Sequence, residues 1–139
     1  MIIMSIDYGD ARTGAAVSDK YEMLAFPVCV IHEKDKGLLS EKIVCLAKEK
    51  EAELIIVGYP KNMDGSEGFK AQAAAEFADI LKESTNLPIE LWDERLTTVS
   101  AHKILNDNNV RGKKRKDTVD AVAAVIILQS YLEYRKNRA

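Results

Sequence analysis

Five carboxylates of this chain stand where strands are expected to end or a helix to begin, and they are the side chains best suited to chemistry: Asp7, Asp93, Glu94, Asp117 and Asp120. Carboxylates that converge from separate elements repel one another unless a cation neutralises them, and Mg²⁺ or Mn²⁺ suits such oxygen ligands. Two such ions about 4 Å apart can orient a water molecule and stabilise the attacking and leaving oxygens of phosphodiester hydrolysis. The pattern therefore predicts a site for two divalent ions.

Simpler roles are open for some of these carboxylates. Asp7 is followed two residues later by a turn glycine, so it could cap a turn without any ligand. Asp117 would lie in the first turn of a helix, where the helix dipole favours any acidic residue by about 0.3–1 kcal/mol. Asp120 is surrounded by apolar residues, so its charge needs a partner or a metal if it faces the sheet. The dipole explanation therefore fits Asp117 better than Asp120.

Strands and helices alternate along the chain in a way that would bring these residues together. Apolar runs and turn residues predict strands over residues 2–9, 13–18, 25–31, 54–58 and 87–92. Helical spacing of apolar residues predicts helices over 37–50, about 67–84, about 97–106, and from 117 onward. In the second helix the predicted core face consists of Phe69, Ala73, Phe77, Ile80 and Leu81. We predict an α/β fold in one domain, residues 1–139, whose mixed sheet of about five strands starts with an antiparallel meander and carries helices on both faces.

Charge and composition limit the possible partners. The net charge of −2 excludes a protein that is basic all over, so nucleic acid would have to bind a local patch. Such a patch is predicted in an exposed loop just before Asp120, formed by Arg111, Lys113, Lys114, Arg115 and Lys116. A solvated loop is the alternative interpretation of this segment. Further candidate contacts are Asn62 and Arg95, and Lys61 and Lys70 offer an alternative path.

Cysteine usage and the absence of a leader point to the cytoplasm. Cys29 and Cys45 lie in apolar contexts without metal-ligand spacing, which is typical of buried thiols in a reducing compartment. The strongest apolar run, residues 121–128, is too short to span a membrane. We therefore expect a cytoplasmic protein that makes no membrane contact.

Four segments together resemble the YqgF-type Holliday junction resolvases, a family of the ribonuclease-H-like superfamily that includes pre-16S rRNA nucleases: residues 7–9, 58–66, 93–98 and 119–128. The resemblance spans nearly the whole chain. It implies a ribonuclease-H-like fold and a divalent-metal-dependent endonuclease. The implied substrate is structured nucleic acid, either the 5′ end of precursor 16S rRNA or branched DNA. By position it also implies a catalytic acidic site of Asp7, the Asp93–Glu94 pair and Asp120, with a weaker match at Asp117.

One acidic residue of the expected site occupies an unusual position for the superfamily. In ribonuclease-H-like nucleases the central strand ends in an acid, whereas here it ends in Gly58 and Tyr59. The substitute carboxylate comes one strand farther out, and strands are spaced about 4.8 Å apart. Because the side chain must recover that distance, we expect the longer Glu94, rather than Asp93, to join Asp7 and Asp120 as a metal ligand.

Two other functional classes are compatible with parts of the pattern. The aspartate, glycine and Thr-Gly hairpin near the N-terminus also resemble the phosphate-binding turn of actin-like and sugar-kinase ATPases. Those enzymes hold nucleotide between two such domains, so this chain would have to act as a dimer. Alternatively, the chain could be a non-catalytic nucleic-acid-binding module in which the basic loop matters most. For the nuclease, either a monomer or a homodimer is expected.

Overall fold

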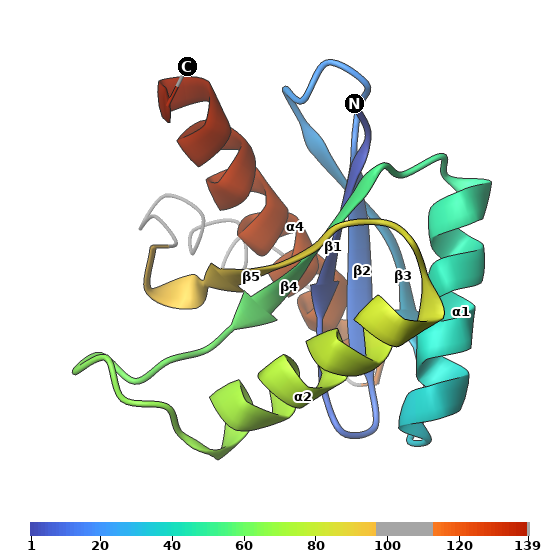
Figure 1. The fold of residues 1–139 in the computed structure, drawn as a ribbon, viewed down its shortest axis with the longest axis vertical. Helices are drawn as coiled ribbons and strands as arrows, with labels where there is room; N and C mark the ends of the chain where they lie inside the picture. Colours follow the sequence, from blue (N-terminus) through green and yellow to red (C-terminus); the bar gives the residue numbers. More distant parts are fainter. Residues whose placement is uncertain (97–112, 139) are drawn as a thin grey trace.

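The computed structural model describes residues 1–96 and 113–138, and over residues 113–120 it describes the course of the helix backbone. A five-stranded sheet has the order β3-β2-β1-β4-β5 (Figure 1). Its strands are β1 (Ile3–Asp7), β2 (Thr13–Ser18), β3 (Ala25–Ile31), β4 (Leu54–Tyr59) and β5 (Ile89–Asp93). The helical elements are α1 (Lys36–Glu49), α2 (Phe69–Ser84), the short 3-10 helix η1 (Glu94–Leu96) and α4 (Lys113–Arg138). The predicted mixed α/β sheet is confirmed.

Strand directions place three carboxyl ends on one edge of the sheet. β1, β2 and β3 form the predicted antiparallel meander. β4 runs parallel to β1 on one side and to β5 on the other, as its unbroken apolar sequence predicted. Because parallel strands end at the same edge, the ends of β1, β4 and β5 lie in a row. Asp7 is the last residue of β1, and Asp93 is the last residue of β5.

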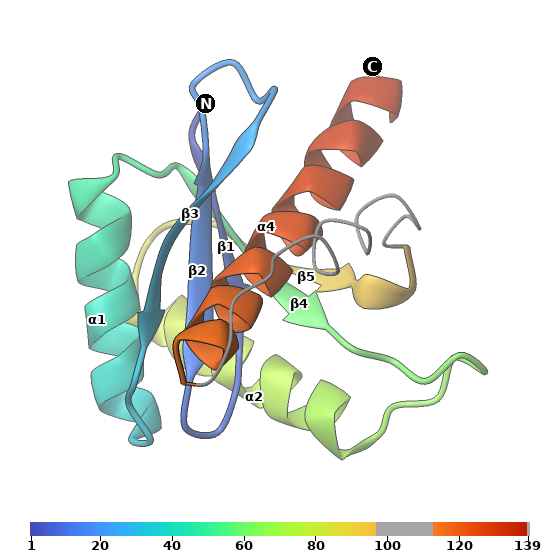
Figure 2. The same ribbon diagram turned by 180° about the vertical axis from the view of Figure 1, so that it is seen from behind.

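Helices cover both faces of the sheet and create two separate cores. Met4 and Ile6 of β1 pack with residues of α1 and α2, including Phe77. Ile3, the residue before Met4, packs on the opposite face against α4 residues such as Ile127. Figures 1 and 2 show α1 and α2 on one side of the sheet and α4 on the other. Since side chains alternate along a strand, Ser5 and Asp7 belong to the face that α4 covers.

The direction of α4 is antiparallel to β1, so its first turns lie near the carboxyl edge of the sheet (Figure 2). A buried hydrogen bond of 2.6 Å, donated by the Ser5 hydroxyl to the carbonyl oxygen of Ala124, fixes the helix against the strand. None of the described helices is long and apolar enough to cross a bilayer.

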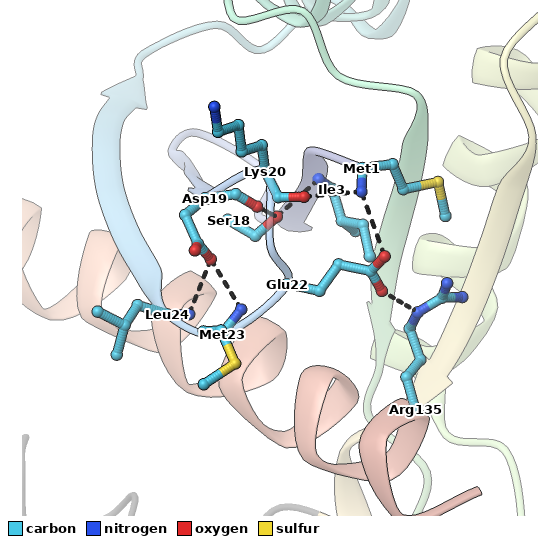
Figure 3. Close-up of polar contacts among 9 residues, drawn as sticks. All are labelled: Met1, Ile3, Ser18, Asp19, Lys20, Glu22, Met23, Leu24 and Arg135. Carbon is cyan, nitrogen blue, oxygen red and sulfur yellow. Dashed lines mark hydrogen bonds and ion pairs between the residues drawn. The ribbon is translucent and has the colours of Figure 1, made fainter. Parts of the chain in front are cut away.

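The turn between β2 and β3 is held by a network of polar contacts (Figure 3). The Asp19 carboxylate accepts hydrogen bonds from the main-chain nitrogens of Met23 and Leu24, at 2.7 and 3.0 Å. Glu22 adopts a left-handed conformation with φ of 59°, and its carboxylate accepts a 2.6 Å hydrogen bond from Nε of Arg135 on α4. The end of α4 is therefore tied to the hairpin at the edge of the sheet opposite the end of β1.

Four sequence predictions need correction or lie outside the described residues. Phe69 is not in the core but is 77% exposed, because α2 buries a different set of residues: Ala71, Ala74, Phe77, Ala78 and Leu81. Cys45 is exposed rather than buried, since it lies on the outward side of α1. The residues Lys113–Lys116 form the start of α4 instead of a loop. The helix predicted over 97–106 and the basic residue Arg111 lie outside the described residues.

Candidate active site

A cavity of about 440 Å³ opens at the carboxyl edge of the sheet, between the ends of β1 and β4 and the start of α2. It brings together acids from separate elements, namely Asp7, Asp10 and Glu94, and two cations, Arg12 and Lys70. The rest of the wall is formed by Tyr8, Gly9, Gly58, Pro60, Phe69 and Ala73. This position, beyond the carboxyl ends of parallel strands, is where open α/β sheets bind ligands.

The turn after Asp7 is rigid for reasons that can be traced to single residues. A side chain at Gly9 would collide with the carbonyl oxygen of Arg12, so the tight β1–β2 turn requires glycine there. The Thr13 hydroxyl lies 3.4 Å from both the nitrogen and the oxygen of Gly9. Tyr8 stacks on Phe77, with ring centroids 4.7 Å apart. Asp7 therefore projects from a fixed piece of backbone.

Glu94 reaches the cavity from the end of β5, across the end of β4. Its carboxylate lies over Gly58, where a Cβ atom would be only 3.0 Å from Oε2 of Glu94. Burial raises the pKa of the Glu94 carboxyl above its ordinary value of 4.5, the charge of Asp93 raises it further, and the ammonium group of Lys70 lowers it. A half-buried acid with a raised pKa gains from a cation placed beside it.

Asp93 is engaged elsewhere. Its carboxylate accepts hydrogen bonds from Nη2 and Nε of Arg95, at 2.7 and 3.0 Å, and from the Arg95 main-chain nitrogen at 3.0 Å. The hydrogen bond from Arg95 lowers the pKa of Asp93 below its usual value. Of the two adjacent acids, it is Glu94 that shares the cavity with Asp7, while Asp93 pairs with Arg95.

The loop from Pro60 to Gly68 holds itself together next to this ion pair. Asn62 accepts a hydrogen bond from the nitrogen of Gly65 and donates through its main-chain nitrogen to Ser66. The Asn62 side chain also donates to the Ser66 hydroxyl at 3.1 Å. Tyr59, at the end of β4, donates its hydroxyl hydrogen to the carboxylate of Glu67. Asn62 thus shapes the loop beside the cavity and does not line the cavity itself.

The backbone of α4 approaches the same edge of the sheet. Asp120 precedes Ala124 by one helical turn, about 6 Å along the axis, and Asp7 follows Ser5 by two strand residues, about 7 Å. Because α4 is antiparallel to β1 and the Ser5–Ala124 hydrogen bond sets their register, both steps lead toward the carboxyl edge. Asp117 lies almost one turn nearer the start of α4.

Several cavity residues had no functional prediction from the sequence. Phe69 was assigned to the core, Asp10 and Arg12 to an ordinary turn, and Lys70 only to an alternative path. The available signal was their position next to Gly9 or just after a loop rich in turn residues. Among the side chains that the structure describes, no three His, Cys, Asp or Glu residues gather closely enough to hold a metal ion. A metal at Asp7 and Glu94 would need a further ligand.

Comparison with known proteins identifies the family. The sequence profile of the RuvX family, described as a Holliday junction resolvase, matches residues 1–134. The chain belongs to the RuvX family. This is the relationship that the four sequence motifs predicted, and a resolvase family hydrolyses phosphodiester bonds, so the chain is a nuclease.

Curated relatives match the chain along its whole length. A protein of Halothermothrix orenii named "Putative pre-16S rRNA nuclease" is 49% identical over 135 residues, covering 97% of this chain and 96% of the relative. A relative of the same name from Desulfitobacterium hafniense is 44% identical over 138 residues, covering 99% and 96%.

Solved structures support the ribonuclease-H-like fold. RuvC of Thermus thermophilus superposes with a TM-score of 0.59 at 12% identity, covering 97% of both chains. The fowlpox virus Holliday junction resolvase superposes with a TM-score of 0.56 at 14% identity, covering 96% of this chain and 99% of that protein. At these identities the likeness concerns the fold, and it agrees with the fold that the RuvX family assignment predicts.

Proposed function

We propose that this nuclease is a divalent-metal-dependent endonuclease that matures the 5′ end of precursor 16S rRNA. The observation that carries the proposal is the cavity at the carboxyl edge, where Asp7 and Glu94 arrive from the ends of two different strands. The name shared by relatives up to 49% identical favours precursor 16S rRNA as the substrate. The family description and the resolvase-like fold favour a second substrate, branched DNA of the Holliday junction type. The protein would act as a monomer or homodimer.

The residues of the cavity suit Mg²⁺ or Mn²⁺. Asp7 and Glu94 offer carboxylate oxygens, the ligands that these hard cations prefer, and partial burial of Glu94 favours a neutralising cation. Asp120 is the third ligand in this proposal, supported by the register of α4 against β1. Two bound ions would supply a water nucleophile and charge stabilisation for phosphodiester hydrolysis.

The remaining residues of the site would handle the polyanion. Lys70 and Arg12 in the cavity wall bring positive charge to within reach of a phosphate group. Arg95 and Asn62 border the cavity from the β4–α2 side, and the basic segment Arg111–Lys116 precedes Asp120 in the sequence. Asp93 would act indirectly, by orienting Arg95. Asp117 would assist from the second turn of α4; because the helix begins at Lys113 and has no acidic residue in its first turn, the helix-dipole role expected for Asp117 from the sequence does not apply.

Calorimetric titration with Mn²⁺ tests the metal site. We expect Asp7→Asn and Asp120→Asn to abolish or greatly weaken binding, because each removes a charged ligand. Asp117→Asn should have a smaller effect. The matched control is Asp79→Asn on α2, whose exposed carboxylate pairs with Lys82 across one helical turn and should leave binding unchanged. If Asp7→Asn and Asp120→Asn both bind Mn²⁺ like the parent, the proposed mechanism is wrong.

Cleavage assays separate the possible substrates. The parent and Asp7→Asn are each incubated with Mg²⁺ or Mn²⁺ and one of three substrates: precursor 16S rRNA, a four-way DNA junction, or an unstructured RNA of matched length. We expect cleavage of the precursor by the parent alone. Tight binding without cleavage of any substrate would favour the non-catalytic module, and saturable ATP turnover that Asp7→Asn abolishes would favour the kinase-like alternative.

A further inference from the structure

The end of β4 is the one place in the row of parallel strand ends where a glycine stands between two acids. β4 lies between β1 and β5, and Gly58 is paired with Trp92 of β5, just before Asp93 and Glu94. On the other side, the last paired residues of β1 and β4 are Ile6 and Val57, so Asp7 and Gly58 are the next residues of the two strands. Gly58 is buried and lines the cavity with both acids.

The space above Gly58 is filled by its neighbours and not by its own side chain. A Cβ atom at this position would lie 3.0 Å from Oε2 and 3.3 Å from Cδ of Glu94. It would also lie 2.7 Å from Cδ1 of Ile127, which approaches from α4. Both contacts are too close, so any side chain at position 58 must displace at least one of these groups. Both groups are ends of flexible side chains, and Glu94 gives way by changing how its carboxylate enters the cavity.

We propose that Gly58 is a positioning residue for Glu94. By leaving the end of β4 without a side chain, it creates the space through which the carboxylate of β5 crosses to the side of Asp7. This inference rests on the proposed function, because it takes Glu94 to be a metal ligand. It adds that the acid of this site can come from β5 only because β4 contributes none, so a carboxylate on residue 58 and the carboxylate of Glu94 compete for one space.

The first experiment separates displacement of Glu94 from simple crowding against α4. Ile127→Val removes the Cδ1 atom that a new Cβ would meet, and it serves as the reference. Adding Gly58→Ala to this reference leaves Glu94 as the closest neighbour of the new methyl group. We expect Mn²⁺ binding, measured by calorimetry, to weaken about 10- to 100-fold, which is the usual cost of disturbing a group that orients a metal ligand. Urea unfolding without metal checks that the double variant is folded.

Gly68→Ala is the matched glycine control. The nearest neighbour of its new Cβ among the described residues would be the side chain of Asn62, at the ordinary contact distance of 3.5 Å, and Gly68 does not line the cavity. Its Mn²⁺ affinity should equal that of the parent. If Gly58→Ala in the Ile127→Val background also binds Mn²⁺ as tightly as the reference, the positioning role of Gly58 is refuted.

The second experiment moves the acid from β5 to β4, and a purely structural role of Gly58 would not produce its expected result. In the Ile127→Val background, which removes the other close neighbour of a Cβ at position 58, Glu94→Ala should lose Mn²⁺ binding and clear the space above Gly58. Introducing Gly58→Asp into Glu94→Ala then supplies a carboxylate within that space, and we expect binding to recover. If the variant with Gly58→Asp binds Mn²⁺ no better than Glu94→Ala in the same background, the proposed competition between carboxylates at positions 58 and 94 is refuted. Failure of the parent itself to bind Mn²⁺ would instead count against the proposed nuclease mechanism.

Discussion

The hydroxyl group of Ser5 and the carbonyl oxygen of Ala124 form a buried hydrogen bond of 2.6 Å that joins the first strand to the last helix. These two elements carry Asp7 and Asp120, so the bond sets the register between two of the proposed metal ligands. Ser5 is fully buried.

Replacing Ser5 by alanine is expected to lower the free energy of unfolding by about 0.5–1.5 kcal/mol, because one buried hydrogen bond between β1 and α4 is lost. Urea unfolding measures the change. Ser130 on the same helix is the matched control, since its buried hydroxyl has no hydrogen-bond partner among the described residues. Ser130→Ala should be neutral or stabilising. Equal losses in the two variants would contradict the importance of the Ser5 bond.

The ion pair between Glu22 and Arg135 should make stability depend on pH in the acidic range. Burial on its own would raise the pKa of Glu22, but hydrogen bonds from Arg135 and from the amino group of Met1 hold that pKa below its ordinary value of 4.5. A lowered pKa means that the folded state binds protons less readily than the unfolded state. The stabilisation is therefore fully present above the unfolded pKa and is lost as the pH falls through the folded pKa.

Comparison of the parent with Glu22→Gln tests this dependence. Urea unfolding between about pH 7 and about pH 3 should show the parent more stable at neutral pH and the difference shrinking in acid. Glu83→Gln, which changes an exposed carboxylate of α2, is the control and should follow the parent at every pH. A difference between parent and Glu22→Gln that stays constant down to the acid end would contradict the prediction.

Two phenylalanines on α2 should differ in how much the same substitution changes stability. Phe77 is fully buried and stacks on Tyr8, whereas Phe69 is 77% exposed at the cavity wall. Phe77→Leu is expected to cost about 1 kcal/mol or more, because it removes an aromatic pair and leaves a gap in the core. Phe69→Leu should change stability by less than about 0.5 kcal/mol. Thermal unfolding of both variants decides between this assignment and the core face predicted from helical spacing.

The basic segment is expected to govern the salt dependence of nucleic-acid binding. Since Lys113, Lys114, Arg115 and Lys116 start α4, glutamine is the suitable replacement because it preserves helix propensity. Each phosphate contact removed should reduce the slope of log affinity against log salt by about 0.7 for single strands or 0.9 for duplex. Fluorescence anisotropy over a salt series measures the slope, while Mn²⁺ affinity should stay nearly unchanged.

A control for the basic segment replaces exposed lysines far from the cavity, Lys48 and Lys50 near the end of α1, by glutamine. An unaltered slope in the variant of Lys113–Lys116 would show that this segment makes no phosphate contact. The nucleic-acid path would then have to run along Lys61, Lys70 and Arg95.

The sequence was most informative where a single local rule decides the structure. β2 and β3 begin and end at the predicted residues, because alternating side chains and flanking turn residues act within a few positions. Asp7 ends β1 for the same reason. Phe69 was assigned wrongly because helical spacing continues one turn beyond the part of α2 that is covered by other elements. The run of four basic residues was assigned to a loop although lysine and arginine are good helix formers.

Within the site, the choice of Glu94 over Asp93 followed from side-chain length alone, and the structure adds a second reason. Arg95 donates four hydrogen bonds to the Asp93 carboxylate. A spacing of two residues makes this pairing possible, but the sequence alone did not predict it. The space above Gly58 was not predictable, because it depends on Ile127 and Glu94, residues from two elements distant in the sequence.

The Ser5–Ala124 contact spans 119 positions of the 139-residue sequence, so it can form only after the chain has been synthesised as far as Ala124. Both strands of the β1–β2 hairpin are synthesised long before α4, and loop closure over such a span is entropically costly and slow. Until α4 packs, the face of the sheet that carries Ser5 lacks its helical cover. Under the proposed function, a nascent chain therefore lacks Asp120 as a metal ligand until α4 has docked on β1.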